Sequence, residues 1–160
     1  MSSGWLNYGK SAPSSQQMMR GRSTLFLDFD GVLHPSFAPP DFQLNLAPLL
    51  VQCLEGYDVQ VVISSSWRFN LSLSQIRHML PAPLAERIIG ATGPPFEGPY
   101  QRWNEICEYA VRYRLLDWRA LDDTDWEFPE NCAELILCDG RMGLTDPQCA
   151  EIARWLALPD

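Results

Sequence analysis

A short apolar run that ends in two closely spaced acids constrains this chain more than any other feature. Residues 23–35 read STLFLDFDGVLHP. The run Leu25–Leu27 is too short for a helix and is typical of a central strand that is buried on both faces of a parallel sheet. Asp28 and Asp30 follow it, and alternation along a strand would place both on one side, with Phe29 turned into the packing. Because ligands bind at the carboxyl ends of such strands, we expect a ligand site here.

The simpler alternative is that the two acids are only turn residues, since Asp and Gly are common where a strand ends. The apolar strand before them and the apolar Val32 and Leu33 after Gly31 argue against this alternative. The pattern therefore favours a site for phosphoryl transfer over a plain turn.

Length and composition indicate one globular domain. A chain of 160 residues with 46% hydrophobic residues is large enough to bury a core. The chain has no stretch of about 18 apolar residues, so no transmembrane helix is predicted. Residues 1–22 are rich in Ser, Gln and Gly and lack the apolar core of a signal peptide, so we predict a flexible tail, a single domain over 23–160 and a cytoplasmic location. The formal net charge of -8 argues against a broad nucleic-acid-binding surface but allows recognition of one phosphate.

The cysteines predict reduced thiols. They are odd in number and include no Cys-x-x-Cys pair, which argues against both a disulfide framework and a zinc site. The five are Cys53, Cys107, Cys132, Cys138 and Cys149.

Strand-like and helix-like stretches alternate along the rest of the chain. Periodicity predicts strands over 59–63, 88–92, 118–121 and 135–138, and helices over 44–55, 71–80, 100–116 and 147–158. Asp146 is the predicted N-cap of the last helix, ahead of a proline at its first position. This order predicts an α/β fold, a three-layer Rossmann-like parallel sheet with helices on both faces.

Two further strand ends carry polar side chains. The predicted strand 59–63 ends in Ser64, Ser65 and Ser66, whose hydroxyl and N–H groups suit an anion, although a serine-rich loop that caps a helix would look the same. Trp67 and Arg68 follow and would either flank the site or serve packing and surface ion pairing.

The strand over 118–121 ends in Asp122 and Asp123. Carboxylates are the ligands that Mg²⁺ prefers in proteins, so this pair could complete a metal site with the acids at 28 and 30, or it could simply keep an acidic loop soluble. Adjacent side chains at a strand end point in opposite directions, so we expect Asp123 to bind the metal and Asp122 to support it.

These segments together resemble the haloacid dehalogenase (HAD)-like hydrolases, whose phosphatase members carry Asp-x-Asp with Mg²⁺. The resemblance implies that Asp28 is the nucleophile, that Asp30 is the general acid and base, and that Mg²⁺ is bound by Asp28, the backbone carbonyl of Asp30 and Asp123. It also implies that Ser64, with Ser65 in reserve, holds the phosphoryl group. The segment 137–146, LCDGRMGLTD, is similar to a narrower group, the HAD domains associated with RNA-repair proteins.

One departure from the family concerns its usual lysine. The chain has no lysine after Asp28, and Arg102 follows a Gly/Pro-rich loop in a similar place in the order of elements. A guanidinium always carries its charge and can grip phosphate oxygens with two hydrogen bonds. We therefore predict that Arg102 replaces the lysine, with Arg87 as a weaker candidate and a plain exposed helix residue as the alternative.

The resemblance implies a Mg²⁺-dependent phosphatase that acts through an aspartyl phosphate. Asp30 and Ser64 are 34 positions apart and Ser64 and Arg102 are 38 apart, which leaves no room for a large cap domain over the site. An open site would admit a bulky phosphorylated substrate such as a nucleic-acid end, but a nucleotide or another small phosphomonoester would also fit. The alternative is a catalytically weak or inactive HAD-like module that binds phosphate or a protein partner.

Overall fold

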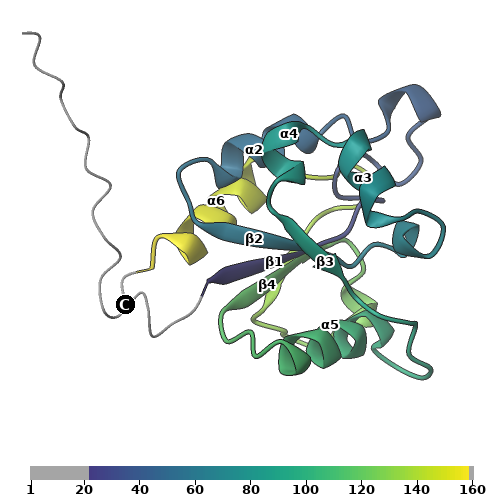
Figure 1. Ribbon diagram of the computed structural model, residues 1–160, viewed down its shortest axis with the longest axis vertical. Coiled ribbons are helices and arrows are strands. Elements are labelled where there is room, and N and C mark those ends of the chain that lie inside the picture. Colours follow the sequence, from purple (N-terminus) through teal and green to yellow (C-terminus); the bar gives the residue numbers. More distant parts are fainter. Residues whose placement is uncertain (1–21, 159–160) are drawn as a thin grey trace, which may run out of the picture.

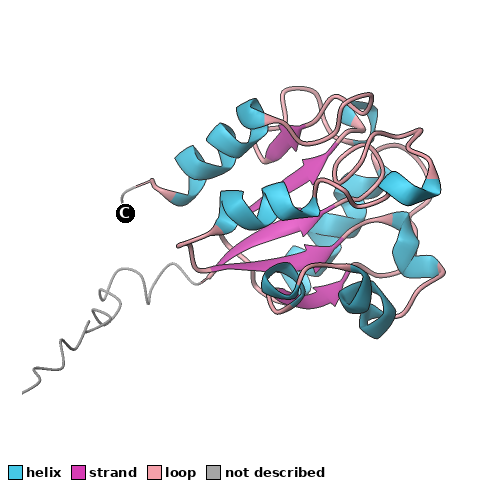
Figure 2. Ribbon diagram, turned by 90° about the horizontal axis from the view of Figure 1, so that it is seen from above, coloured by secondary structure: helices cyan, strands magenta, loops and turns pink. Residues whose placement is uncertain are grey.

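The protein folds around one parallel sheet. The computed structural model describes residues 22–158, so nearly all of the predicted tail lies outside the described residues. The strands of the sheet are β1 Ser23–Leu27, β2 Val59–Ile63, β3 Ile88–Ala91, β4 Trp118–Asp122 and β5 Leu135–Leu137. They lie side by side in the order β3-β2-β1-β4-β5, and every pairing is parallel (Figure 2).

Helices cover both faces of this sheet. The α-helices are α2 Ala47–Leu54, α3 Leu73–Met79, α4 Ala82–Ala85, α5 Gln101–Arg112 and α6 Asp146–Leu156, and the 3-10 turns are η1 Pro40–Phe42, η2 Ser66–Phe69 and η3 Asp125–Glu127. Helices α2, α4 and α6 lie over one face and α5 lies under the other (Figure 1). The three-layer architecture predicted from the sequence is confirmed, and no large cap domain is present among residues 22–158.

The alternation of β1 side chains decides which face of the sheet each site residue meets. Leu25 and Leu27 lie in a large core with the side chains of α2 and α6. Phe26 points to the opposite face and lies in a smaller core with residues of α5. The same alternation carries Asp28 toward α5 and buries Phe29 in the larger core.

Two helix starts differ from prediction because of local capping. The short helix α4 is absent from the predicted elements; Pro81 is its N-cap and a second proline lies in its first turn, where a missing N–H costs nothing. Helix α6 is capped by Thr145 rather than by Asp146, through a reciprocal capping box with Gln148.

Among the described residues, no helix has the length and apolar character needed to cross a bilayer.

The prediction of five reduced cysteines is wrong for one pair. Cys53 on α2 and Cys149 on α6 form a disulfide, with a Cα–Cα distance of 5.4 Å. The two residues are 96 positions apart, and only the packing of α2 against α6 on the same face of the sheet brings them together. The spacing of cysteines along the sequence therefore does not indicate this disulfide.

Candidate active site

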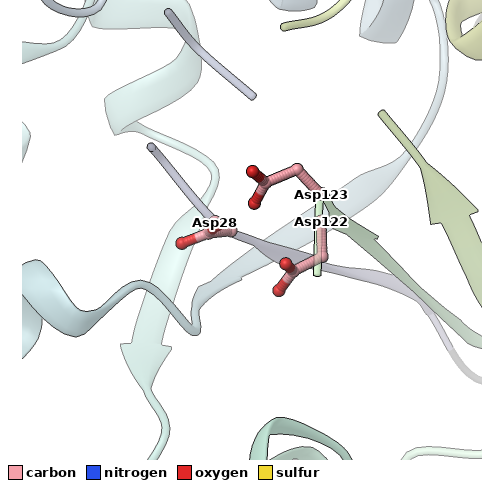
Figure 3. Close-up of side chains that lie close together, drawn as sticks. All are labelled: Asp28, Asp122 and Asp123. Carbon is pink, nitrogen blue, oxygen red and sulfur yellow. The ribbon is translucent and has the colours of Figure 1, made fainter. Parts of the chain in front are cut away.

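Three carboxylates converge where β1 and β4 end. Asp28, Asp122 and Asp123 each offer an oxygen within 4.8 Å of the others (Figure 3). The two strands are neighbours in register, with Leu27 beside Leu121, so their next residues reach the same edge of the sheet. Carboxylate oxygens grouped in this way are a donor set that suits a hard divalent cation such as Mg²⁺.

Burial and the repulsion between neighbouring acids raise the pKa values of Asp28 and Asp123. Burial, followed by the charge of Asp122, raises the pKa of Asp28 to about 8, although the charge of Arg102 opposes the shift. Burial and Asp122 also raise the pKa of Asp123. A cation held between Asp28 and Asp123 would relieve the repulsion that contributes to both shifts.

Arg102 provides the fixed cation of the site. It lies on the first turn of α5, is 9% exposed, and its Nη1 is 2.7 Å from Asp122 Oδ2 and 3.3 Å from Asp28 Oδ1. Burial disfavours its charge, but Asp122 and Asp28 more than offset that effect, so the pKa of Arg102 is raised. The structure thus brings the predicted arginine into contact with the predicted nucleophile.

Asp122 and Asp123 have different surroundings. Asp122 is fully buried and its oxygens are occupied, Oδ2 by Arg102 and Oδ1 by the backbone N–H and hydroxyl of Thr124. Asp123 points to the other side, where the Ser36 hydroxyl lies 3.4 Å from its Oδ2 and 2.9 Å from the carbonyl of Gly140. The division between a metal-binding Asp123 and a supporting Asp122 stays a prediction.

Two glycines make room for the Asp123 carboxylate. A Cβ atom at Gly31 or at Gly140 would collide with Asp123 Oδ2. Gly31 also has a φ of +75°, a conformation that other residues rarely adopt. The glycine after the Asp-x-Asp segment is therefore required both for the turn and for the position of a carboxylate from a different strand.

A buried hydroxyl without a partner lies beside Asp28. Ser64 follows β2, its N–H donates to the carbonyl of Leu27, and its Oγ is buried without any hydrogen bond. An unsatisfied buried hydroxyl is costly and typical of a site that binds a ligand. Ser65 is different, because its Oγ accepts a hydrogen bond from the N–H of Trp67 and caps η2. Thr92, after β3, also has a buried unpartnered hydroxyl, which the sequence interpretation missed.

The carboxylate of Asp30 is held away from the acid cluster. His34 Nδ1 accepts a hydrogen bond from the N–H of Leu44, so its Nε2 carries the proton and donates to Asp30 Oδ1 at 2.8 Å. Trp67 Nε1 donates to Asp30 Oδ2 at 2.9 Å. Sequence reasoning missed His34, although its spacing of four residues from Asp30 is a signal that could have indicated the contact. Metal binding by the Asp30 backbone carbonyl stays a prediction.

The other candidate arginines have structural roles. All three guanidinium nitrogens of Arg68 donate to backbone carbonyls, and its Nη2 also pairs with Glu105 at 2.9 Å. The carbonyls are those of Ser64, Ser65, Thr92 and Gly93. Burial lowers the pKa of Arg68, and Glu105 only partly offsets the shift. Arg87 donates to the carbonyls that connect α2 to β2, namely those of Leu54, Tyr57 and Val59. Neither guanidinium is free to bind a phosphate.

The parallel sheet, the strand-end acids and the lack of a large cap define a HAD-like domain. A family model described as "HAD domain in Swiss Army Knife RNA repair proteins" matches residues 24–149, well over half of the chain. The chain belongs to this family. No curated protein and no solved structure gives a significant match. At a coarse level, this membership supports a hydrolase of the phosphatase type with a phosphorylated substrate.

Proposed function

We propose that the protein is a Mg²⁺-dependent phosphomonoester hydrolase that uses Asp28 as its nucleophile. The observation that carries this proposal is the arrangement around Asp28: a buried arginine 3.3 Å away, two further carboxylates and a buried serine hydroxyl without a partner. A structural ion-pair network would not leave Ser64 Oγ unsatisfied. A phosphoryl oxygen would satisfy it.

The acid cluster fits the metal that such chemistry needs. Asp28 and Asp123 would hold Mg²⁺, with Asp122 supporting them from its bonds to Arg102 and Thr124. When bound, the ion would offset the repulsion between an anionic nucleophile and an anionic phosphate.

Four side chains carry out the remaining steps of the proposed reaction. Asp28 attacks phosphorus as the bond to the leaving oxygen breaks, and the phosphoryl group becomes an aspartyl phosphate. Asp30 gives its proton to the leaving oxygen, then takes a proton from the water that hydrolyses the aspartyl phosphate. Arg102 and Ser64 hold the phosphoryl oxygens during both steps.

The contacts of Asp30 support its role. His34 and Trp67 each donate to a different oxygen of its carboxyl group, so the group is fixed in orientation and kept apart from the acid cluster. A carboxyl oxygen that accepts one hydrogen bond can still exchange a proton with a substrate. The same contacts explain how two acids only two residues apart could serve as nucleophile and as acid.

Turnover of a generic aryl phosphate tests the proposal. We expect hydrolysis that depends on Mg²⁺ and disappears in Asp28→Asn, with beryllofluoride binding to the wild type as a mimic of the aspartyl phosphate. The absence of a large cap and the RNA-repair description of the family support phosphorylated RNA ends as the first substrates to screen, beside DNA ends, nucleotides, sugar phosphates and phosphopeptides. A folded, Mg²⁺-binding protein that hydrolyses none of these would instead be the inactive phosphate-binding module.

A further inference from the structure

An apolar pocket is formed by the loop that follows His34, and Ser36 of this loop contacts Asp123. It has a volume of about 370 Å³, within the range of small-ligand sites. The segment from Pro35 to Asn45 and one residue from the loop after β5 line it. The lining residues are Pro35, Phe37, Ala38, Pro39, Phe42, Asn45 and Arg141.

Hydrogen bonds connect this pocket to both acids that flank the reacting position. Ser36, between two lining residues, donates through its hydroxyl to Asp123 and through its N–H to the carbonyl of Gly140. Leu44, next to the lining residue Asn45, donates to His34, which donates to Asp30. The loop that lines the pocket is therefore linked through His34 to Asp30, the group that would protonate the leaving oxygen.

The loop that forms the pocket is shaped in advance. Pro35, Pro39 and Pro40 restrict its backbone, and Leu44 has a φ of 61°. The N–H of Phe42 bonds to Pro39, and the N–H of Leu46 bonds back to Leu33. A pocket that is already formed binds its ligand with a smaller loss of entropy.

The lining indicates what the pocket binds. Phe37 is 93% exposed and Phe42 is 55% exposed, so the pocket has two aromatic residues that are open to solvent. Asn45 adds an amide with both donors and an acceptor, and Arg141 adds a guanidinium that Asp139 holds in place. Aromatic faces, a guanidinium plane and an amide are the groups that stack on nucleobases and read their edges.

Resting on the proposed function, we propose that this pocket binds the nucleobase of the leaving nucleoside at a phosphorylated nucleic-acid end. The substrate would place its phosphate on Asp28 and its terminal base between Phe37 and Phe42. The protein would then select nucleotide ends over sugar phosphates without the broad basic surface that its net charge of -8 argues against. Asn45 would distinguish one base from another by hydrogen bonding.

Paired substrates test the assignment. We would measure kcat/KM for 5′- and 3′-phosphorylated dinucleotides, each against a counterpart without the terminal base. We expect the base to raise kcat/KM roughly 5- to 100-fold for one of the two ends, as one stacked base contributes. Phe37→Ala and Phe42→Ala should reduce this ratio toward one, while Tyr113→Ala, which removes an exposed aromatic at the far end of α5, should leave it unchanged.

A binding experiment separates this proposal from the proposed function. Amide and side-chain NMR shifts of the full chain would be followed during titration with an unphosphorylated dinucleotide. Shifts centred on Phe42 and Asn45 support the pocket even if no phosphate ester is hydrolysed. No shifts there, a base preference that survives both phenylalanine substitutions, or a stronger preference for a phosphotyrosine peptide that depends on the same rings would overturn it.

Discussion

The two faces of the sheet contribute to the candidate site in different ways. On the α5 face, charges are fixed by buried ion pairs: Arg102 joins Asp28 and Asp122, and Glu105 joins Arg102 to Arg68. On the face of the larger core, neutral donors and loops do the positioning. His34 and Trp67 hold Asp30, and two glycines and Ser36 surround Asp123.

The two faces hold their acidic side chains in place by different interactions. A buried ion pair that loses one partner leaves an uncompensated charge, which is strongly destabilising. A hydrogen-bonded carboxyl at a partly exposed position loses mainly its orientation. We therefore expect the loss of a buried arginine on the α5 face to lower stability, and substitutions around Asp30 to affect turnover selectively.

The largest expected effect is that of Asp28→Asn. Removing the nucleophile should lower turnover by at least about four orders of magnitude. The substitution also removes a buried acid whose pKa is raised to about 8, so the metal-free variant should unfold at a temperature no lower than the wild type at neutral pH. Steady-state kinetics and thermal unfolding measure the two effects. Near-normal turnover in a folded Asp28→Asn protein would remove Asp28 from the nucleophile role.

The second prediction compares Arg102 with Arg68. Arg102→Ala should lower turnover about 10- to 1000-fold, or roughly 1.4 to 4 kcal/mol, because a transition-state contact is lost. Arg102→Lys should recover part of it, since a lysine also carries the charge. Arg102→Ala should also lower stability, because Asp28 and Asp122 lose their buried partner. Arg68→Ala should lower stability by about 3 to 5 kcal/mol, because Glu105 is left buried without its closest partner, and should change turnover less.

Denaturant unfolding of each variant, with kinetics at a temperature where all remain folded, separates stability from turnover. If Arg68→Ala reduced kcat as much as Arg102→Ala while both stayed folded, the assigned division between the two arginines would not hold.

Most of the α5 face could be predicted from the sequence, for a physical reason. Strand ends in a parallel sheet meet at one edge, so apolar runs followed by Asp28, Ser64 and Asp122 are enough to bring these residues together. Arg102 follows from the order of elements and from the need for a fixed cation. Side-chain alternation also anticipated the different surroundings of Asp122 and Asp123.

The other face could be predicted less well because it depends on loops. The contact of Trp67 with Asp30 follows from the path of η2, and the contact of His34 with Leu44 follows from a loop whose last residues adopt an unusual φ. Neither path has a periodic pattern in the sequence. The pairing of Cys53 with Cys149 likewise depends on which helices share a face.

The third prediction concerns the orientation of Asp30. His34→Gln and Trp67→Phe should each lower kcat about 10-fold for an alkyl phosphate, whose leaving group needs a proton, within the range assigned to general acid catalysis. The same variants should change turnover of an activated aryl phosphate little, because that leaving group departs without protonation. A purely structural role would lower both rates alike. Comparing kcat for the two esters in each variant therefore tests whether these residues act through Asp30.

The smallest expected effect on turnover is that of the disulfide between α2 and α6. Closing a loop of 96 residues restricts the unfolded chain, so Cys53→Ser should lower the free energy of unfolding by about 2 to 4 kcal/mol. Cys138→Ser, at a free and buried cysteine, provides a comparison without a crosslink. Because the crosslinked helices lie on the face of the sheet opposite α5 and Arg102, kcat in the folded Cys53→Ser protein should match that of the wild type (Figure 1). Reducing agent should lower the melting temperature of the wild type and leave that of Cys53→Ser unchanged. A loss of turnover in Cys53→Ser at temperatures where it is fully folded would contradict this prediction. It would show that packing in the larger core affects the position of Asp30 or Asp123, so that the two faces of the sheet are not independent.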